Sequence, residues 1–358
     1  MAENDVLVRP EDLEPFVDEL FRRAGLAPDD AAYCARCLVN TNLWGIDSHG
    51  VLRLPAYLQR LRKHALNPRP QTRLLRGSQG LEVMDGDDGP GFVVGRDAML
   101  RAIELAEIHN VGVVGAIRSN HFGAAALYAR LAAERGMVGI AMTNVIPNIV
   151  APGGSKPITG NNPIAIAIPT YGDFPFVLDM SLSAVAGGKL LLASKKGEKI
   201  PLDWATDKDG RPTDDPDQAF AGFLLPMGGF KGLGLSYAVD ILCGLITGGV
   251  FGDQMKSMYA HPDDPSLTGH LMIALNLAAI IQPEEMQARM GAFYARLKAA
   301  PMRDPNAELF LPGEIEYRTA QKRRAQGLPI PPKLYEELKV LGAELGVSRP
   351  LTPMAAAA

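Results

Sequence analysis

The chain lacks the features that mark several specialised classes of protein. Three cysteines in 358 residues are too few for a disulfide framework, and their number suits a reducing cytoplasm. The net charge is −4, and the nearest approach to a basic run, KRR at 322–324, lies in a stretch of mixed charge. A nucleic-acid partner, which needs clustered Lys and Arg, is therefore not expected. The opening residues show no charged and apolar leader, so no secretory signal is expected.

The sequence also has few metal-binding motifs and few long apolar runs. Cys34 and Cys37 form a C-x-x-C in a helical, apolar stretch without a second Cys or His pair nearby, so we expect them to pack within one helix. No H-x-x-x-H occurs, and no metal site is expected. The segment 233–252 is long enough to resemble a membrane span, but Asp240 near its middle and five glycines favour a buried, glycine-rich helix. No membrane association is predicted.

The glycine motifs do not match a standard nucleotide fingerprint. Gly89, Gly91 and Gly95 follow an expected strand, but their spacing is one residue too long, and Pro90 removes an amide that a pyrophosphate would use. A tight turn that starts a helix is the better interpretation. The segment GGFKGLG at 228–234 leads into a helix, and its backbone amides and one ammonium group could hold an anion. Glycine-rich helix packing would give the same pattern.

What the chain does have is an alternation of apolar segments. The N-terminal part reads as three helices, at 10–25, at 29–43 and from 55 onward, followed by a proline-rich connection at 67–77. Short apolar strands then alternate with helices, and the C-terminal third is mainly helical. This pattern predicts an α/β fold with a central sheet buried on both faces. The expected strands lie at 81–86, 111–119, 138–145 and 163–170, and the helices between them at 92–110 and 124–137.

The segment WGIDSHGVLR, at 44–53, holds the first candidate catalytic group. Imidazole titrates near neutral pH, and His49 stands between Ser48 and Gly50, where the chain can turn tightly and Ser48 can orient the ring. Arg53 lies four residues after His49, and both side chains project from the same side if a helix begins here. A guanidinium can bind a carboxylate through two parallel hydrogen bonds. A proton donor beside a carboxylate clamp suits reduction of a 2-oxo or 2-imino acid. A helix cap with a surface salt bridge is the equal alternative.

A second histidine, His121, follows an expected strand in SNHFGAAALY. Side chains at the carboxyl ends of strands in α/β folds commonly face the ligand crevice, although a structural cap is the alternative. His64, His109, His261 and His270 have no such setting and are expected at the surface or in packing. A Ser/His/Asp hydrolase is disfavoured, because the adjacent residues Asp47, Ser48 and His49 cannot form a triad and no G-x-S-x-G occurs.

With these motifs in view, the sequence resembles the type-2 malate/L-lactate dehydrogenase family. That family also includes sulfolactate, ureidoglycolate and diketogulonate oxidoreductases and reductases of cyclic imino acids. The resemblance spans about residues 8 to 345 and implies a mixed central sheet that binds NAD or NADP without the Rossmann fingerprint, as in sulfolactate dehydrogenase, in a homodimer. It rests on blocks in one order: GIDSHGVLRLPAY, SNHFGAAALYA, PGGSKPITGNNPIAIAIP, FVLDMSLSAVAGGKL, PLDWATDKDGRPT, GGFKGLGLS and LPGEIE.

The resemblance also implies roles for individual residues. His49 would be the proton donor, Ser48 its relay partner, and Arg53 the partner of the substrate carboxylate. His121 would act in acid–base chemistry or lie at the nicotinamide. Asn161 stands where many relatives have the threonine of G-T-N-P, a position that can touch substrate. Cofactor contacts are implied at His121, Phe122, Gly123, Ala124, Ala125, Asp179, Met180, Ser181, Lys231, Gly232, Pro312, Gly313 and Glu314.

The expected function is therefore that of a cytoplasmic NAD(P)-dependent oxidoreductase that interconverts a small 2-hydroxy acid and its 2-oxo acid, of the malate/lactate type. The alternatives are an NADPH-dependent reductase of a cyclic 2-imino acid, of the piperideine/pyrroline-2-carboxylate type, and a non-catalytic nucleotide or carboxylate sensor. We expect a helical, substrate-side region at 1–118, joined by 310–358, and an NAD(P)-binding α/β domain at 119–309.

Overall fold

A seven-stranded mixed sheet forms the centre of the molecule in the computed structural model, which describes residues 5–354. All neighbouring strands are antiparallel except β3 and β4, which the crossover through α4 makes parallel. The sheet confirms the predicted α/β class with a mixed sheet. In spatial order the strands are β2 (Arg73–Ser78), β3 (Leu81–Asp85), β4 (Val111–Ser119), β12 (Thr268–Asn276), β5 (Met137–Thr143), β8 (Ile164–Ile168) and β9 (Phe176–Met180).

Three of these strands, β2, β9 and β12, lie outside the expected strand ranges. β12 lies between β4 and β5, in a region where the sequence predicted mainly helix, and it pairs with both neighbours. Its apolar run, TGHLMIALN, is buried on both faces of the sheet, so it shows no alternation that would separate a strand from a buried helix. β2 lies at the sheet edge, within the stretch expected to be a proline-rich connection, and all its residues are exposed.

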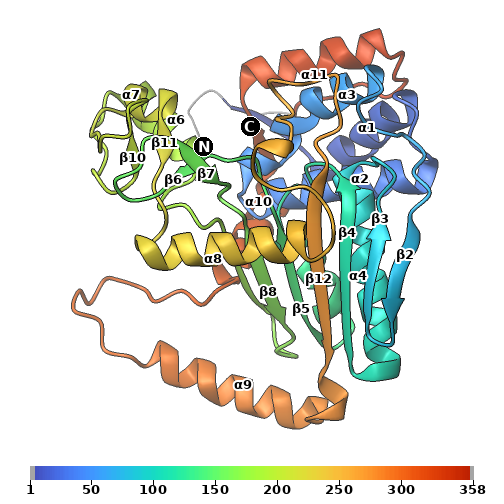
Figure 1. The fold of residues 1–358 in the computed structure, drawn as a ribbon, viewed down its shortest axis with the longest axis vertical. Coiled ribbons are helices and arrows are strands. Elements are labelled where there is room, and N and C mark those ends of the chain that lie inside the picture. Colours follow the sequence, from blue (N-terminus) through green and yellow to red (C-terminus); the bar gives the residue numbers. More distant parts are fainter. Residues whose placement is uncertain (1–4, 355–358) are drawn as a thin grey trace.

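Helices cover both faces of this sheet (Figure 1). α4 (Gly91–His109) and α5 (Ala126–Ala133) pack on one face, and their alanines join its main core. On the other face α8 (Phe230–Asp240) continues into a π-helical turn, Ile241–Leu245, and packs through Val239 and Cys243.

The prediction that this glycine-rich helix is buried was wrong, because only one side of it is covered. Tyr237, Ile241 and Leu245 are 40%, 44% and 48% exposed. Among residues 5–354 no helix is both long enough and apolar enough to cross a membrane.

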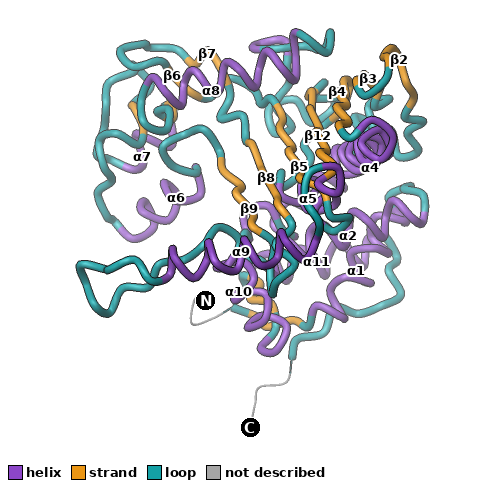
Figure 2. Tube along the Cα trace, turned by 90° about the horizontal axis from the view of Figure 1, so that it is seen from below, coloured by secondary structure: helices purple, strands orange, loops and turns teal. Residues whose placement is uncertain are grey.

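The N-terminal helices form a separate layer beside the sheet, joined by the C-terminal helix, as Figures 1 and 2 show. The prolines at the first helical positions fit this layer, since a missing N–H costs nothing there. Cys34 and Cys37 are free and buried within the second helix, as predicted. The layer contains α1 (Pro10–Arg23), α2 (Pro28–Leu43), α3 (Leu54–Arg62), α10 (Glu314–Gln326), α11 (Pro332–Glu344) and the paired strands β1 (Val6–Val8) and β13 (Leu328–Ile330).

A small lobe with its own apolar core projects beside α8 (Figure 1). It holds a four-stranded sheet in the order β10, β11, β6, β7. Its elements are β6 (Ile149–Val150), β7 (Pro157–Thr159), α6 (Gly187–Lys196), β10 (Ala205–Thr206), α7 (Pro216–Ala221) and β11 (Phe223–Leu224).

α9 (Pro283–Lys298) lies beyond the end of the sheet and contains no buried residue.

The expected division near residue 118 falls at the end of β4, inside the seven-stranded sheet, so the two expected regions share one sheet. The division into a substrate-side and a cofactor-side region stays a prediction.

Candidate active site

The SHG turn lies between α2 and α3 as two short 3₁₀ turns, Asp47–His49 and Val51–Arg53. Gly50 joins them because a Cβ there would lie 2.2 Å from the side-chain oxygen of Asn42. That same oxygen accepts a hydrogen bond from the amide of Val51, at 2.9 Å. The glycine of the motif therefore serves close packing against α2, which fixes the path of the turn.

Asp47 ties the turn to the C-terminal part of the chain. Its carboxylate accepts two hydrogen bonds from Arg323 on α10, at 2.6 and 2.8 Å, and a third from Asn42 at 2.6 Å. A two-pronged guanidinium–carboxylate pair has defined geometry as well as strength. The turn is therefore clamped between α2 and α10.

The structure brings Ser48, His49 and Arg53 together, as the sequence predicted. Ser48 Oγ lies 3.0 Å from Nδ1 of His49, and Arg53 Nε donates to the backbone oxygen of Ser48 at 2.7 Å. Burial, and then the charge of Arg53, lower the pKa of His49 to about 4. His49 is thus a neutral imidazole at pH 7, with Nδ1 occupied by the serine.

His121 stands at the end of β4 and faces His49. The two rings are stacked, with centroids 5.8 Å apart and planes 19° from parallel. Nδ1 of His121 lies 2.6 Å from the hydroxyl of Tyr57 and accepts from the amide of Gly123 at 3.4 Å. Because a backbone amide can only donate, Nδ1 carries no proton and the neutral ring is protonated at Nε2. Burial holds the pKa of His121 well below its usual range, and the charge of Arg53 lowers it further.

Two tyrosines at this site were missed from the sequence. Tyr57 follows Arg53 by four residues on α3, a helical spacing that could have placed both on one face. Tyr259 gives no such signal, since it lies 206 residues from Arg53, yet its hydroxyl accepts a hydrogen bond from the Arg53 guanidinium and its ring lies 5.6 Å from that group.

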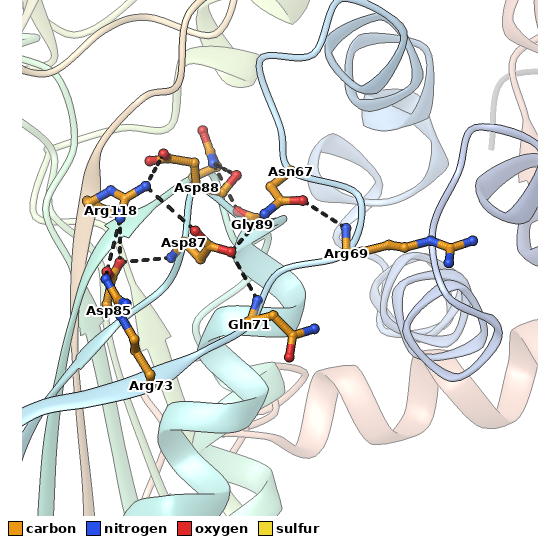
Figure 3. A network of polar contacts seen from close by, with 10 residues as sticks. Asn67, Arg69, Gln71, Arg73, Asp85, Asp87, Asp88, Gly89 and Arg118 are labelled. Carbon is orange, nitrogen blue, oxygen red and sulfur yellow. Dashed lines mark hydrogen bonds and ion pairs between the residues drawn. The ribbon is translucent and has the colours of Figure 1, made fainter.

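A network of polar contacts holds the turn around Gly89 (Figure 3). The side-chain nitrogen of Asn120 donates to the backbone oxygens of Asp88 and Gly89, at 3.0 and 2.9 Å. A Cβ at Gly91 would lie 2.2 Å from the backbone oxygen of Asn120. Arg118 fixes the turn through Asp85 and Asp88, at 3.0 and 2.5 Å. The turn starts a helix, as predicted, and its glycines serve packing within the chain.

His270 lies in the sheet behind the site and is fully satisfied by its neighbours. Its ring nitrogens bond to Thr143 at 2.8 Å and Ser119 at 2.7 Å, and its ring stacks on Phe122 at 4.6 Å. Burial lowers its pKa to about 3. This is the packing role that the sequence predicted. The surface role predicted for others is also confirmed, since His64, His109 and His261 are exposed.

The glycine turn before α8 is open, in contrast to the imidazole site. Gly228 and Gly229 have φ of 60° and 66°, and no atom lies within 4 Å of where their Cβ atoms would be. No side chain caps the helix, and Lys231 in its first turn is exposed. Free amides at a helix N-terminus beside a cation fit the phosphates of a dinucleotide. Gly232 instead serves packing, because a Cβ there would lie 2.1 Å from the backbone oxygen of Met227.

Two of the segments expected at the cofactor meet at the start of α5. Asp179 on β9 accepts a hydrogen bond at 2.9 Å from the amide of Ala126, the residue that follows the expected stretch from Phe122 to Ala125. Burial raises the pKa of Asp179 to about 6, and the amide bond opposes that rise. Met180 ends the strand, and Ser181 Oγ lies 3.1 Å from Ser183 Oγ.

The segment Pro312–Gly313–Glu314 also contacts β9. The amide of Val177 donates to the backbone oxygen of Pro312 at 3.1 Å. Gly313 has a φ of 92°, and a Cβ there would lie 2.8 Å from the backbone oxygen of Pro175.

The carboxylate of Glu314 is already occupied within the chain. It pairs with Lys298 at 2.7 Å and Arg318 at 2.5 Å, and it accepts the amide of Leu311 at 2.9 Å. Only the backbone of this residue is therefore left to contact a cofactor.

Asn161 lies on the small-lobe side, and no hydrogen bond between described residues joins it to the imidazoles. Its side-chain oxygen accepts from Asn148 at 3.1 Å, and its backbone oxygen accepts from the amide of Leu182 at 2.8 Å. In the part of the chain that the structure describes, no three His, Cys, Asp or Glu side chains group as metal ligands.

Comparisons with known proteins identify the family to which the chain belongs. Residues 8–339 match the family described as Malate/L-lactate dehydrogenase. The L-sulfolactate dehydrogenase of Methanocaldococcus jannaschii is 37% identical to this chain, over 96% of this chain and 98% of the relative. A solved structure of sulfolactate dehydrogenase from that organism has a TM-score of 0.89 and 38% sequence identity. That match covers 95% of this chain and 97% of the other. The Ureidoglycolate dehydrogenase (NAD(+)) of Escherichia coli K12 is 33% identical over 92% and 93% of the two chains.

The structure of a delta1-piperideine-2-carboxylate reductase from Pseudomonas syringae is also similar. Its TM-score is 0.82 at 27% identity, with coverage of 94% of this chain and 99% of the other. The family match spans nearly the whole chain, and among similar dehydrogenases the name of the Escherichia coli enzyme specifies NAD(+) and that of a (2R)-3-sulfolactate dehydrogenase of Chromohalobacter salexigens specifies NADP(+). The chain belongs to the malate/L-lactate dehydrogenase family and is an NAD(P)-dependent oxidoreductase that acts on a small 2-hydroxy acid or its 2-oxo partner.

Proposed function

We propose that the reaction takes place where His49, His121 and Arg53 meet, with a small 2-hydroxy acid of the malate or lactate type as substrate. The observation that carries this proposal is the pair of stacked imidazoles, 5.8 Å apart, next to a guanidinium. Neutral rings whose Nδ1 atoms are already occupied have only Nε2 left to offer a substrate.

His49 moves the proton in this scheme. In the oxidation direction its neutral ring takes the proton of the substrate hydroxyl, and Ser48 holds Nδ1 while the imidazolium forms. The nicotinamide of NAD(P), when bound, supplies or accepts the hydride at the substrate carbon. In the reduction direction His49 returns the proton to the oxygen of the 2-oxo group.

Arg53 holds the substrate carboxylate and also tunes His49. Its positive charge is one of the causes that lower the pKa of His49. A bound carboxylate offsets that charge and so raises the pKa of His49, which prepares the ring to take a proton only when substrate is present. His121, protonated at Nε2, donates a hydrogen bond to the substrate beside the nicotinamide.

The cofactor lies, in this proposal, between the open glycine turn and the start of α5. Lys231 and the amides after Gly229 hold phosphate, while Asp179, Met180, Ser181 and the stretch from Phe122 to Ala125 line the nicotinamide half. The support is the bond from Ala126 to Asp179, which joins two of these segments. Gly232 and the backbone of Pro312, Gly313 and Glu314 complete the cofactor contacts.

A second candidate reaction is reduction of a cyclic 2-imino acid, which the similar piperideine-2-carboxylate reductase favours. Both substrate classes present a carboxylate to Arg53 and a C2 heteroatom to His49. Asn161, in place of the more usual threonine, is the residue that we propose selects between them. Its side chain is held toward Asn148 by a 3.1 Å bond.

We further propose a cytoplasmic homodimer. The dimer is supported by apolar surface that is exposed in the single chain. No residue of α9 is buried, and Phe293 on this helix is 51% exposed. The three cysteines are free, which suits a reducing compartment. Analytical ultracentrifugation at micromolar concentration measures the association state, and a monomer there would contradict the dimer.

A substrate panel tests the reaction. Absorbance at 340 nm is followed with pyruvate, oxaloacetate, 3-sulfopyruvate and piperideine-2-carboxylate, each with NADH and with NADPH. We expect oxidation of the cofactor with at least one 2-oxo acid. Turnover with the cyclic imine alone would favour the second candidate reaction. No change in absorbance with any of these substrates, together with tight cofactor binding, would favour a sensor.

A further inference from the structure

Arg53, the residue proposed to bind the substrate carboxylate, already uses two of its three nitrogens within the chain. Nε donates its single hydrogen to the backbone oxygen of Ser48 at 2.7 Å, and Nη1 donates to the hydroxyl of Tyr259. Among residues 5–354, Nη2 has no hydrogen-bond partner. The two-pronged pair through Nε and Nη2 is therefore closed to a substrate, and Nη2 alone keeps both of its hydrogens for an acid.

The hydroxyl of Tyr259 provides a further donor at this guanidinium. A phenol can accept one hydrogen bond and donate another, and this one accepts from Arg53. In the described part of the chain no group accepts the phenol's own hydrogen. Tyr259 is 57% exposed, its ring lies 5.6 Å from the guanidinium carbon, and Arg53 is not buried either. The two side chains thus offer a free O–H beside a partly free guanidinium.

The segment that carries Tyr259 is attached to the elements that hold the proposed catalytic groups. It connects the π-helical turn after α8 to β12. The backbone oxygen of Asp264 in this segment accepts from Arg60 on α3 at 2.7 Å. The amide of Ser266 donates to the side-chain oxygen of Asn120, next to the second imidazole, at 2.8 Å. The position of the phenol is therefore fixed relative to both α3 and the end of β4.

We propose that Tyr259 is a second substrate-binding residue, whose O–H donates to one oxygen of the substrate carboxylate while Nη2 of Arg53 donates to the carboxylate as well. This inference rests on the proposed role of Arg53 and adds a donor to it. A phenol that accepts from a cation is polarised, which makes it a stronger donor to an anion. The carboxylate is unchanged by the reaction, so Tyr259 binds the ground state and the transition state alike and acts on KM rather than on kcat.

The Y259F variant keeps the ring and removes only the hydroxyl. We expect KM for the 2-oxo acid, and Ki for oxamate measured at saturating NADH or NADPH, to rise by about 5- to 20-fold, with kcat within threefold of wild type. Y237F, which changes a tyrosine of α8 that is 40% exposed, should leave all three quantities unchanged. Unchanged KM and Ki in Y259F, with a raised KM in R53M, would overturn this inference alone. An unchanged KM in R53M would overturn the proposed carboxylate site as well.

The double variant R53M/Y259F separates direct contact with the substrate from support of Arg53. A phenol that only positioned the guanidinium would have no effect once Arg53 is replaced. We expect KM in the double variant to exceed that of R53M by at least about threefold, because the phenol still donates to the carboxylate. Equal KM values in R53M and in the double variant would overturn direct contact.

A crystal structure with NADH or NADPH and oxamate locates the hydrogen bond. We expect Oη of Tyr259 to lie about 2.5 to 3.0 Å from a carboxylate oxygen of oxamate. A phenol that bonds only to Arg53, with its oxygen beyond hydrogen-bonding distance of the bound acid, would overturn the proposal.

Discussion

The two ends of the proposed active site are built in opposite ways. At the imidazole end the chain supplies its own partners: Ser48 for His49, Tyr57 for His121, and a bidentate pair between Arg323 and Asp47 behind them. At the glycine end no atom lies within 4 Å of where the Cβ atoms of Gly228 and Gly229 would be, and no side chain caps α8. The groups that we propose carry out the chemistry are therefore positioned in advance, while the proposed phosphate site is an uncapped helix N-terminus open to a ligand.

This contrast predicts that substitutions at the imidazole end change turnover and that those at the glycine end change cofactor binding. The largest effect should come from H49A, which removes the proton-transferring ring. We expect kcat to fall by about 10² to 10⁴-fold, with cofactor Kd, measured by fluorescence titration, within threefold of wild type. H64A, which changes an exposed histidine, should retain wild-type kcat. A fall of less than tenfold in H49A would contradict the role of His49.

R53M should separate substrate binding from cofactor binding. Loss of a charged partner for a carboxylate costs about 1.5 to 3 kcal/mol, so KM for the 2-oxo acid should rise by roughly 10- to 100-fold. Steady-state kinetics at saturating cofactor measure it, with R22M at an exposed ion pair as control. An unchanged KM would place the carboxylate elsewhere.

The acid stability of the fold should reveal how deeply the histidines are buried. The folded-state pKa values of His49 and His270 are lowered to about 4 and about 3, so each contributes stability that is present above pH 6.5 and is lost as the pH falls toward those values. Each should remove about 1.4 kcal/mol per pH unit in that window. Urea unfolding from pH 7 to 5 measures the slope, and H270Q should lessen it. A stability independent of pH there would show that these rings titrate normally.

Y57F should alter the pH profile as well as the rate. The phenol bond to Nδ1 favours neutral His121, so its removal should raise the pKa of that ring and move the acid limb of kcat to higher pH, with kcat itself about tenfold lower. Y335F removes another buried phenol bond, to the backbone of Leu351 at 2.7 Å, and should leave the profile in place. A Y57F profile that superimposes on wild type would reduce Tyr57 to a packing residue.

The smallest effect should come from K231A at the open end. An exposed ammonium that contacts a phosphate contributes about 0.5 to 1 kcal/mol, so the cofactor Kd should rise by about two- to fivefold while kcat stays near wild type. K333A, on the exposed side of α11, should change neither quantity. A loss of kcat in K231A without a change in Kd would reverse the contrast between the two ends.

The sequence was informative where function depends on neighbours along the chain. Ser48, His49 and Arg53 are close in sequence, and one turn between two helices brings them together. The strands β3, β4, β5 and β8 were predicted for the same reason, because each is bounded by turn residues and followed by a helix or loop.

The features that were missed depend on contacts between distant segments. β12 sits between β4 and β5, about 150 residues from β4 in sequence, and an apolar run that is buried on both faces carries no strand period. Tyr259 meets Arg53 only because the loop before β12 returns to α3. The exposed side of α8 was missed because an apolar helix gives no sign of which face the chain itself covers.

The most direct measurement is a crystal structure of the protein with NADH or NADPH and oxamate, a non-reacting mimic of a 2-oxo acid. We expect the oxamate carboxylate to lie on the Arg53 guanidinium and its C2 oxygen to lie within hydrogen-bonding distance of Nε2 of His49. An imidazole at position 49 that points away from the bound acid, or is separated from it by protein in every subunit, would show that His49 does not transfer the proton.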